Sequence, residues 1–317
     1  MNKIVVIGLG NVGFTYINIA LSKGVEAEWV LVDKNEDLCI AHAHDFEDML
    51  SINPNNQSTF KVGNLLDAAN ADIVVITASI PRISGNADRI KLASENVKLM
   101  KTFADALKKA DFKGIIIVPS NPCDVMAAAF HYLGFPHEKV ISTGTLLDTA
   151  RLRKFIAKKY NVSPSLVKTS IVGEHGTSAT PIWSTSTVDN KKLLDLIQDE
   201  NELSELREKV INEGYYISSR KGNTQFGIGM SIYEITNAIL NDTNQIINIG
   251  VKLPDNFKNR GIYSSIPVSV GKNGYKYLNN AMFMTDKELD LFNKSTLKMA
   301  NVHSEILEII GIKKNFN

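Results

Sequence analysis

The stretch KIVVIGLGNVG, residues 3–13, decides the fold of this chain of 317 amino acids. Ile4–Ile7 contains only isoleucine and valine, which is typical of a short strand buried on both faces. Three glycines follow, in the spacing G-x-G-x-x-G. Between a strand and a helix, this spacing is typical of a turn that binds the pyrophosphate of a dinucleotide. A glycine-rich turn without a ligand would fit the three glycines alone, but it does not explain the strand and helix on either side of them.

Each glycine of this turn has its own physical role. Gly8 permits a tight turn, Gly10 lets a phosphate approach the backbone, and Gly13 lets the following helix pack against the strand. The helix is expected to begin near Asn11 and Val12, where its free N–H groups would point toward the phosphate. These five residues are therefore predicted to bind a cofactor.

Asp33 closes a second apolar run, residues 29–33, and lies 20 positions after Gly13 (33 − 13). A carboxylate at this place can accept a hydrogen bond from the 2′-hydroxyl of a ribose. It would repel a 2′-phosphate, so the sequence favours NAD over NADP.

The composition excludes several classes of protein. The hydrophobic content is 44%, and the formal net charge is +1 with charged residues scattered along the chain, so no bulk attraction to nucleic acid or to an anionic membrane is expected. No apolar run reaches the ~18 residues that a membrane-spanning helix needs, and the first residues do not resemble a signal peptide. Cys39 and Cys123 form neither a disulfide framework nor a metal site, and both are expected to be buried. We expect a cytoplasmic protein that binds no metal.

The first part of the chain alternates strand and helix patterns, which predicts an α/β fold with a doubly wound parallel sheet of the Rossmann type. Residues 1–145 are expected to form the NAD-binding domain. The predicted strands are 4–7, 30–32, 73–77, 115–118 and 140–142, and the predicted helices are 12–22, 36–50, 88–109 and 125–133.

The pattern changes near residue 146, and residues 146–317 are expected to form an α+β domain that binds substrate and carries out catalysis. The turn Lys272–Gly274 predicts a hairpin, and Thr285–Glu288 reads as a capping box before a final helix. The other predicted elements are helices 149–160, 201–219 and 228–240, a strand 167–172, and antiparallel strands 261–270 and 275–280.

Four further motifs carry residues suited to chemistry. GEHG at 173–176 follows the strand 167–172, and a histidine between glycines at a strand end is placed to face a cleft. A single histidine is more often a surface or core residue, so the neighbouring motifs matter. They are SNP at 120–122, LDTAR at 147–151, and Asp88-Arg89 after a segment that contains Pro81 and Gly85.

These motifs resemble those of the L-lactate and malate dehydrogenase superfamily, over nearly the whole chain. Within it the sequence is similar to L-lactate and L-2-hydroxyisocaproate dehydrogenases. The resemblance implies an NAD-dependent L-2-hydroxy acid dehydrogenase, in the first place an L-lactate dehydrogenase of glycolysis and fermentation that converts pyruvate and NADH into L-lactate and NAD. The alternatives are an L-2-hydroxyisocaproate dehydrogenase for larger 2-oxo acids, a malate dehydrogenase, and an NAD-binding sensor without turnover. The resemblance also implies a homo-oligomer, either a tetramer or a dimer.

Three residues are expected to carry the reaction. Hydride transfer from a 2-hydroxy acid needs a base for the hydroxyl proton, and His175 is the candidate because imidazole titrates near neutral pH. Asp148 would orient the ring and stabilise its cation, and it could at the same time cap the helix 149–160. Arg89 would polarise the reacting carbonyl, and the resemblance implies that its loop closes over the substrate.

The resemblance also assigns substrate and cofactor contacts. Arg151, three residues after Asp148, would clamp the substrate carboxylate, with a surface ion pair as its alternative. Asn121 would contact both substrate and nicotinamide, unless it is only a turn residue before a proline. Thr224 in the motif KGNT would line the substrate pocket, and Ile228 would pack on the nicotinamide ring unless it serves the core. The cofactor set is completed by Thr77, Ala78 and Ser79.

Two places depart from the family pattern. The loop before Arg89 is one residue longer than in lactate dehydrogenases and has Ser79 where they usually have glycine. Arg82 then falls near the second arginine of malate dehydrogenases, which makes it a candidate substrate contact, but Thr224 favours the lactate type. Arg153 resembles one half of the fructose-1,6-bisphosphate site of bacterial lactate dehydrogenases, while Thr185 stands in place of its histidine partner. We expect weak or absent activation by the sugar bisphosphate.

Overall fold

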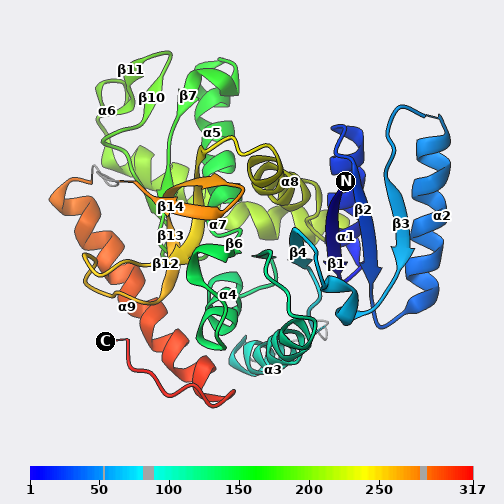
Figure 1. Ribbon diagram of the computed structural model, residues 1–317. Coiled ribbons are helices and arrows are strands. Elements are labelled where there is room, and N and C mark those ends of the chain that lie inside the picture. Colours follow the sequence, from blue (N-terminus) through cyan, green and yellow to red (C-terminus); the bar gives the residue numbers. More distant parts are fainter. Residues whose placement is uncertain (53, 81–88, 279–283, 317) are drawn as a thin grey trace.

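The computed structural model describes residues 1–52, 54–80, 89–278 and 284–316, with the backbone alone at residues 89 and 90. Within these ranges the largest sheet has nine strands in the order β14-β13-β12-β6-β5-β4-β1-β2-β3 (Figure 1). Strands β1 to β6 run parallel, and their order reverses between β1 and β4. The predicted α/β class with a doubly wound parallel sheet is confirmed. The six strands are β1 (Asn2–Ile7), β2 (Ala27–Val32), β3 (Thr59–Val62), β4 (Ile73–Ile76), β5 (Ile115–Val118) and β6 (Val140–Ser142).

The parallel strands form here because their residues can be buried on both faces. Every residue of β4 and β5 is buried, and so is Ile4–Ile7 in β1. The connecting helices pack against the sheet and against other helices, with α1 beside α8 (Phe226–Leu240) and α3 beside α4. They are α1 (Asn11–Ser22), α2 (Glu36–Ile52), α3 (Arg89–Lys109) and α4 (Cys123–Tyr132), with short 3₁₀ turns η1 (Leu65–Ala68) and η2 (His137–Lys139).

The second half of the chain extends the same sheet. β12 (Gln245–Lys252) lies antiparallel beside β6, and β13 (Tyr263–Gly271) and β14 (Gly274–Tyr277) form the predicted hairpin at the edge. The boundary proposed between residues 145 and 146 falls at the start of a helix, but strands on both sides of it share one sheet. The sequence did not predict β12.

The prediction of a single strand over residues 167–172 is wrong. This stretch is divided into β7 (Val167–Lys168) and β8 (Ile171–Val172), because the two parts pair in different small sheets. β7 joins β10 (Thr187–Val188) and β11 (Lys191–Lys192), whereas β8 joins β9 (Thr180–Pro181). Residues just after β8 therefore lie beside the large sheet, where Gly173 forms a bridge with Ser265 of β13.

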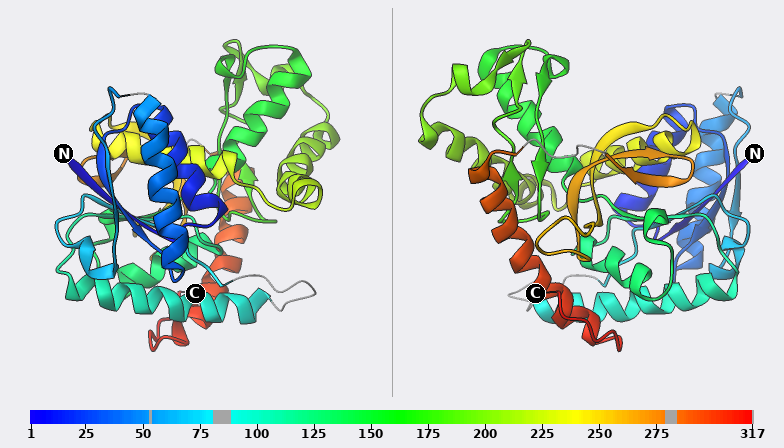
Figure 2. Two further views of the ribbon diagram at one scale, coloured as in Figure 1. Left: turned by 90° about the vertical axis from the view of Figure 1, so that its right-hand side faces the viewer. Right: turned by 60° about the vertical axis from the view of Figure 1, so that its left-hand side comes forward.

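The remaining helices form a separate lobe and one long helix, α9. The lobe around α5 and α7 has its own apolar core, which includes Leu152, Ile156 and Leu206. Helix α9 begins with the predicted capping box of Thr285 and Glu288 and runs from the lobe to the region of α3 and α4 (Figure 2). These elements are α5 (Leu146–Tyr160), η3 (Pro164–Leu166), α6 (Leu193–Leu196), α7 (Glu200–Lys221), α8 (Phe226–Leu240) and α9 (Asp286–Glu308). No helix within the described ranges is long and apolar enough to cross a membrane.

Candidate active site

The turn between β1 and α1 gives each of its glycines a different environment. Gly8 has φ of +102°, and a Cβ there would overlap the backbone of Ala78. A Cβ on Gly13 would overlap the carbonyl oxygen of Gly8 and lie 3.0 Å from Thr77 Oγ1. A Cβ on Gly10 would meet no atom within 4 Å. The turn and the helix packing are thus as predicted, and the space in front of Gly10 stays open.

The residues around this turn fit a dinucleotide such as NAD. Helix α1 has Gly10 as its N-cap and no side-chain cap, so the N–H groups of its first turn are free to meet a phosphate. Asp33 follows β2, and its carboxylate accepts hydrogen bonds from the N–H groups of Leu9 at 2.7 Å and Asn35 at 3.0 Å. A carboxylate has about four lone-pair sites, so Asp33 keeps acceptors for ribose hydroxyls.

Asn96 joins the loops after β4 and β5 and was missed in the sequence. It is 1% exposed, accepts a hydrogen bond from the N–H of Ile80 at 2.8 Å, and donates one to the carbonyl of Asn121 at 3.1 Å. Ser120 donates to the carbonyl of Ala78 at 2.9 Å. Residues 77–80 and Asn121 are thereby fixed together at the carboxyl edge of the sheet. The sequence feature that could have identified Asn96 is that it is a polar residue at an apolar position of a helix.

The structure brings His175, Asp148 and Arg151 together. His175 Nδ1 lies 2.5 Å from Asp148 Oδ2, and Arg151 Nη1 donates to Asp148 Oδ1 at 3.2 Å. The Asp148 and Arg151 side chains are 7% and 11% exposed, so the alternative of a surface ion pair is wrong. The N-cap role considered for Asp148 is also wrong, because α5 begins at Leu146 with Thr145 as its cap. His175 is 28% exposed and so remains accessible.

The surroundings of Asp148 and His175 shift the pKa values of both groups. Burial alone would raise the pKa of Asp148, but His175 and Arg151 outweigh it and lower this pKa. Burial alone would lower the pKa of His175, but the charge and hydrogen bond of Asp148 raise it above the ordinary value. Near neutral pH the pair can therefore hold an imidazolium beside a carboxylate.

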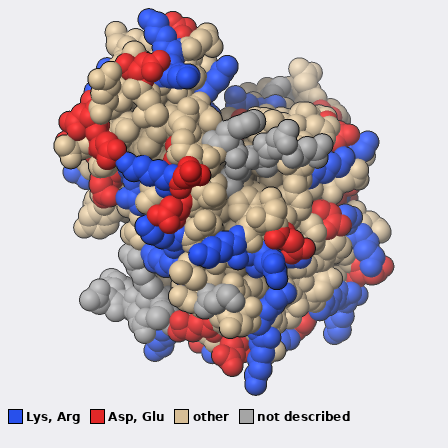
Figure 3. All heavy atoms as spheres, turned by 90° about the vertical axis from the view of Figure 1, so that its left-hand side faces the viewer, with Lys and Arg blue, Asp and Glu red and all other residues tan. Residues whose placement is uncertain are grey.

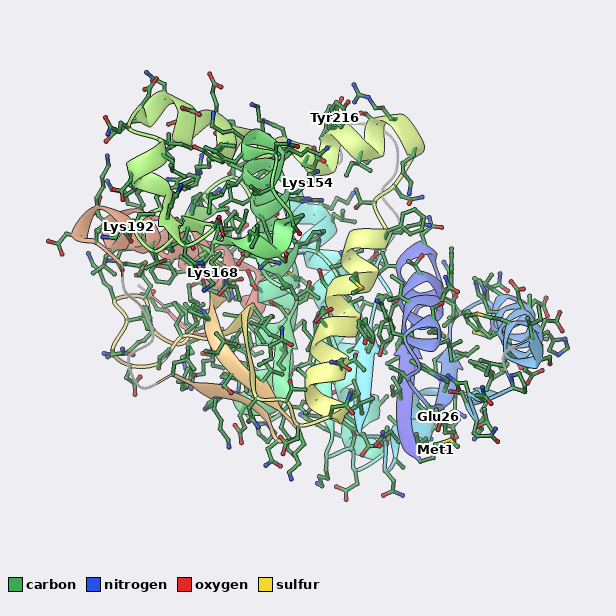
Figure 4. All side chains as sticks on the ribbon, turned by 90° about the horizontal axis from the view of Figure 1, so that it is seen from above. Met1, Glu26, Lys154, Lys168, Lys192 and Tyr216 are labelled. Atoms are coloured by element: carbon green, nitrogen blue, oxygen red, sulfur yellow. The ribbon has the colours of Figure 1, made fainter. Side chains whose placement is uncertain are left out.

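Helix α7 passes beside the guanidinium of Arg151. A Cβ on Gly214 would lie 3.5 Å from Arg151 Nη2, so the absence of a side chain leaves room there. Lys154 of α5 forms an ion pair with Glu213 of α7, and Figure 4 shows Lys154 beside this helix. The pair fixes α7 against the face of α5 that carries Arg151.

The other predicted site residues have no contact with His175 and Asp148 among the described hydrogen bonds. Arg82 and the side chain of Arg89 lie outside the described residues, and α3 begins at Arg89. Thr224 lies in the turn between α7 and α8, and neither it nor Ile228 forms a hydrogen bond with His175 among the described contacts. Ile228 is half-buried and packs against the main core, in line with its alternative role.

Two family models match this chain. The NAD binding domain of lactate/malate dehydrogenase matches residues 2–142, and its alpha/beta C-terminal domain matches residues 145–309. The chain belongs to the lactate/malate dehydrogenase family. It is an NAD-dependent dehydrogenase, and the predicted family and cofactor are confirmed.

Similar proteins come from both branches of this dehydrogenase family. The L-lactate dehydrogenase of Mycoplasmoides gallisepticum is 40% identical over 99% of this chain and 100% of its own length. The minor L-lactate dehydrogenase of Enterococcus mundtii has a TM-score of 0.90 at 31% identity, covering 95% of this chain and 97% of its own. The malate dehydrogenase of Plasmodium falciparum has a TM-score of 0.91 at 26% identity, covering 98% and 100%. Overall fold similarity therefore does not separate the two activities.

Asp124 is a second buried carboxyl group of this dehydrogenase that the sequence did not single out. It lies in the first turn of α4, accepts a hydrogen bond from the Ser142 hydroxyl, and bonds the backbone N–H of His175. Burial raises its pKa to about 6. The sequence feature that could have identified Asp124 is its position two residues after Pro122 of the motif SNP.

Arg153 lies on the other face of α5 and lines a cavity of about 750 Å³ together with Thr185 and Glu234. The two positions compared with the sugar-bisphosphate site thus share one hollow. Among the described residues, no group of three or more His, Cys, Asp or Glu side chains is arranged to hold a metal.

Proposed function

We propose that this dehydrogenase is an L-lactate dehydrogenase that reduces pyruvate with NADH. The observation that carries the proposal is the contact between the half-buried His175 and the buried Asp148, beside Arg151. This arrangement suits a small substrate with one carboxylate next to the reacting carbonyl. The L-lactate dehydrogenases among the similar proteins support the same substrate.

The protein supplies proton transfer through His175. Because Nδ1 is bonded to Asp148, the other ring nitrogen, Nε2, faces the substrate and gives its proton to the carbonyl oxygen. Asp148 stays ionised and stabilises the imidazolium until the proton is given. In the direction of lactate oxidation, His175 takes the hydroxyl proton back. NADH supplies the hydride when bound.

Arg151 is proposed to bind the substrate carboxylate. One guanidinium nitrogen, Nη1, is bonded to Asp148, and the remaining N–H groups can form a bidentate pair. Arg89 would polarise the carbonyl, and Asn121 and Thr224 would line the pocket.

The cofactor contacts follow from the fit of the turn. The first-turn amides of α1, at Asn11 and Val12, would bind the pyrophosphate in the open space at Gly10, and Asp33 would bind the ribose. Thr77, Ala78 and Ser79 would lie along the dinucleotide, with Ile228 near the nicotinamide.

The test is a panel of 2-oxo acids with NADH: pyruvate, 2-oxoisocaproate, phenylpyruvate and oxaloacetate. We expect kcat/KM to be higher for pyruvate than for oxaloacetate, and the variant Arg82→Gln to change little. A preference for oxaloacetate that disappears in Arg82→Gln would make this a malate dehydrogenase. If 2-oxoisocaproate is preferred and Arg82→Gln changes little, the enzyme is of the hydroxyisocaproate type.

We also propose that the protein is a cytoplasmic homo-oligomer, a tetramer or a dimer, with its domains divided between residues 145 and 146. The relatives' family supports an assembly of identical subunits. Light scattering of the purified protein measures the mass, and a monomer at micromolar concentration would overturn the proposal.

A further inference from the structure

The catalytic loop, residues 173–179, is held in part by a helix that starts more than a hundred residues later. Gly173 pairs with Ser265 of β13 through two hydrogen bonds of 2.9 and 3.1 Å, and its φ is +87°. A Cβ on Gly173 would lie 2.8 Å from Ser295 Oγ of α9. Helix α9 therefore approaches the loop so closely, two residues before His175, that glycine is required there.

Ser295 bonds the loop on both sides of His175. It is 1% exposed, and its hydroxyl accepts the N–H of Glu174 at 3.1 Å and lies 2.9 Å from Ser178 Oγ. The Ser178 hydroxyl donates a hydrogen bond to Glu174 Oε2 at 2.5 Å. Ser295 must then donate to Ser178, since each hydroxyl has one proton. All three groups are satisfied only when the loop keeps this shape.

Lys298 adds a charged contact one turn further along α9. Its Nζ donates to Glu174 Oε2 at 3.2 Å and to Thr177 Oγ1 at 3.0 Å. Burial alone would raise the pKa of Glu174, but the bonds from Ser178 and the charge of Lys298 lower it. Glu174 is thus ionised at neutral pH.

The loop is also held by Arg207 of α7. Arg207 donates to the carbonyl of Thr177 at 2.6 Å and to that of Ala179 at 3.0 Å. His175, which is 28% exposed, is therefore the centre of a loop whose flanking residues are bonded to two helices. Lysines, arginines and acidic residues are mixed over the face of the molecule shown in Figure 3.

We propose that Ser295 and Lys298 are positioning residues that keep His175 within hydrogen-bond distance of Asp148. The two glycines of the loop, Gly173 and Gly176, leave its backbone free to rotate unless its neighbours are bonded. A shift of the ring by ~1 Å would break the contact of 2.5 Å and can cost about a hundredfold in rate. The inference rests on the proposed function only through the substrate used in the assay.

The test uses two variants with matched controls on the same helix. Ser295→Ala removes the buried hydroxyl, and Ser304→Ala is its control, since Ser304 bonds only the carbonyl of Ala300 among the described contacts. Lys298→Met removes the charged contact, and Lys294→Met is its control, since Lys294 pairs with Asp290 on the surface.

We expect kcat for pyruvate reduction to fall roughly ten- to a hundredfold in Ser295→Ala and less in Lys298→Met, with KM for NADH unchanged. The controls should keep the parent kcat. The alkaline limb of the pH profile of kcat/KM should move to lower pH, because His175 loses part of the contact that raises its pKa. Lys298→Arg should restore most of the activity. A purely structural serine or lysine would lower Tm without moving the pH profile.

A second readout needs no substrate. The ring of His175 is titrated by NMR in the protein without cofactor, with its signal assigned by its loss in His175→Asn. We expect a lower pKa in Ser295→Ala than in the parent. An unchanged titration together with kcat equal to that of the controls would overturn the inference. If Ser295→Ala does not fold, Lys298→Met decides, because Lys298 is 51% exposed. If the parent reduces no 2-oxo acid, the proposed function fails while the titration still tests the loop.

Discussion

The phosphate turn at residues 8–13 and the catalytic loop at residues 173–179 are both glycine-containing turns that follow a strand, but they are held in different ways. The turn is held largely by backbone: the N–H of Gly8 bonds the carbonyl of Val32, and Gly13 packs on the carbonyl of Gly8. The catalytic loop has one backbone pairing, between Gly173 and Ser265, and is otherwise held by side chains of α4, α5, α7 and α9. A site made of backbone is specified by a local pattern of glycines, whereas a site made of side chains depends on contacts that a local pattern does not contain.

The largest effect is expected from breaking the catalytic loop at its centre. His175→Asn removes the group that transfers the proton, so turnover should fall by at least ~10²–10⁴. NADH affinity, measured by fluorescence titration, should stay at the parent value because the phosphate turn is untouched. Residual turnover within about tenfold of the parent would show that another group carries the proton.

A matched pair of variants breaks the phosphate turn in two distinguishable ways. Gly13→Ala places a Cβ against the carbonyl oxygen of Gly8, so the free energy of unfolding should fall by roughly 3 kcal/mol or more. Gly10→Ala meets no atom within 4 Å and has an extended backbone, so stability should change by less than about 0.5 kcal/mol.

Only NADH binding should suffer in Gly10→Ala, because the new methyl group occupies the space left for the pyrophosphate. Denaturant unfolding and NADH titration separate the two outcomes. Parent-like NADH affinity in Gly10→Ala would mean that the dinucleotide does not pass this residue.

The fold was predictable wherever burial left a local pattern. Inner strands of the parallel sheet such as β4 and β5 are continuous apolar runs, and the capping box at Thr285 gave the start of α9 correctly. The edge strand β3, with the sequence TFKV, has no such run and was not predicted. β12 was missed because Asn248 and Gly250 interrupt its apolar residues. It pairs with β6 only through Gly250 and Ser142, 108 residues apart (250 − 142). That pairing joins the second half of the chain to the parallel strands of the large sheet, and no local sequence pattern predicts it.

The candidate site was predictable as motifs but not as contacts. The proximity of Asp148 and Arg151 follows from helical spacing, and that of Asp148 and His175 followed only from a family resemblance. Asp124 and Ser295 were missed because each acts on a partner far away in the chain. Serine and aspartate in a helix have many ordinary roles, so only the packed structure shows which of them reach the catalytic loop.

The loop region should also make stability depend on pH through Asp124. Its folded pKa is raised from 3.8 to about 6, so the folded state is not penalised near pH 4 and loses stability as pH rises toward 6 and above. Asp124→Asn keeps the acceptor for Ser142 but carries no charge. The difference in free energy of unfolding between Asp124→Asn and the parent should grow in favour of the variant by about 1–3 kcal/mol from pH 4 to pH 7.

The control is Asp105→Asn, an exposed carboxylate paired with Lys101 on α3. Urea unfolding at several pH values measures the difference. If the advantage of Asp124→Asn were the same at pH 4 and pH 7, the buried carboxyl group would not titrate in this range.

The smallest expected effect sharpens the comparison from the side of the phosphate turn. Asp33 serves the backbone and the cofactor at once: its carboxylate bonds the N–H of Leu9 at 2.7 Å and lies where a ribose would bind. Asp33→Asn retains an acceptor for Leu9 but removes the charge that repels a 2′-phosphate. The ratio of kcat/KM for NADPH to that for NADH should therefore rise about tenfold, which corresponds to ~1.4 kcal/mol. Glu36→Gln, a change in the first turn of α2, is the nearby control and should leave the ratio unchanged. An unchanged ratio in Asp33→Asn would place the ribose elsewhere. A lowered Tm with no change in preference would assign Asp33 to the backbone of the turn alone, so that even this site would be held by a side chain.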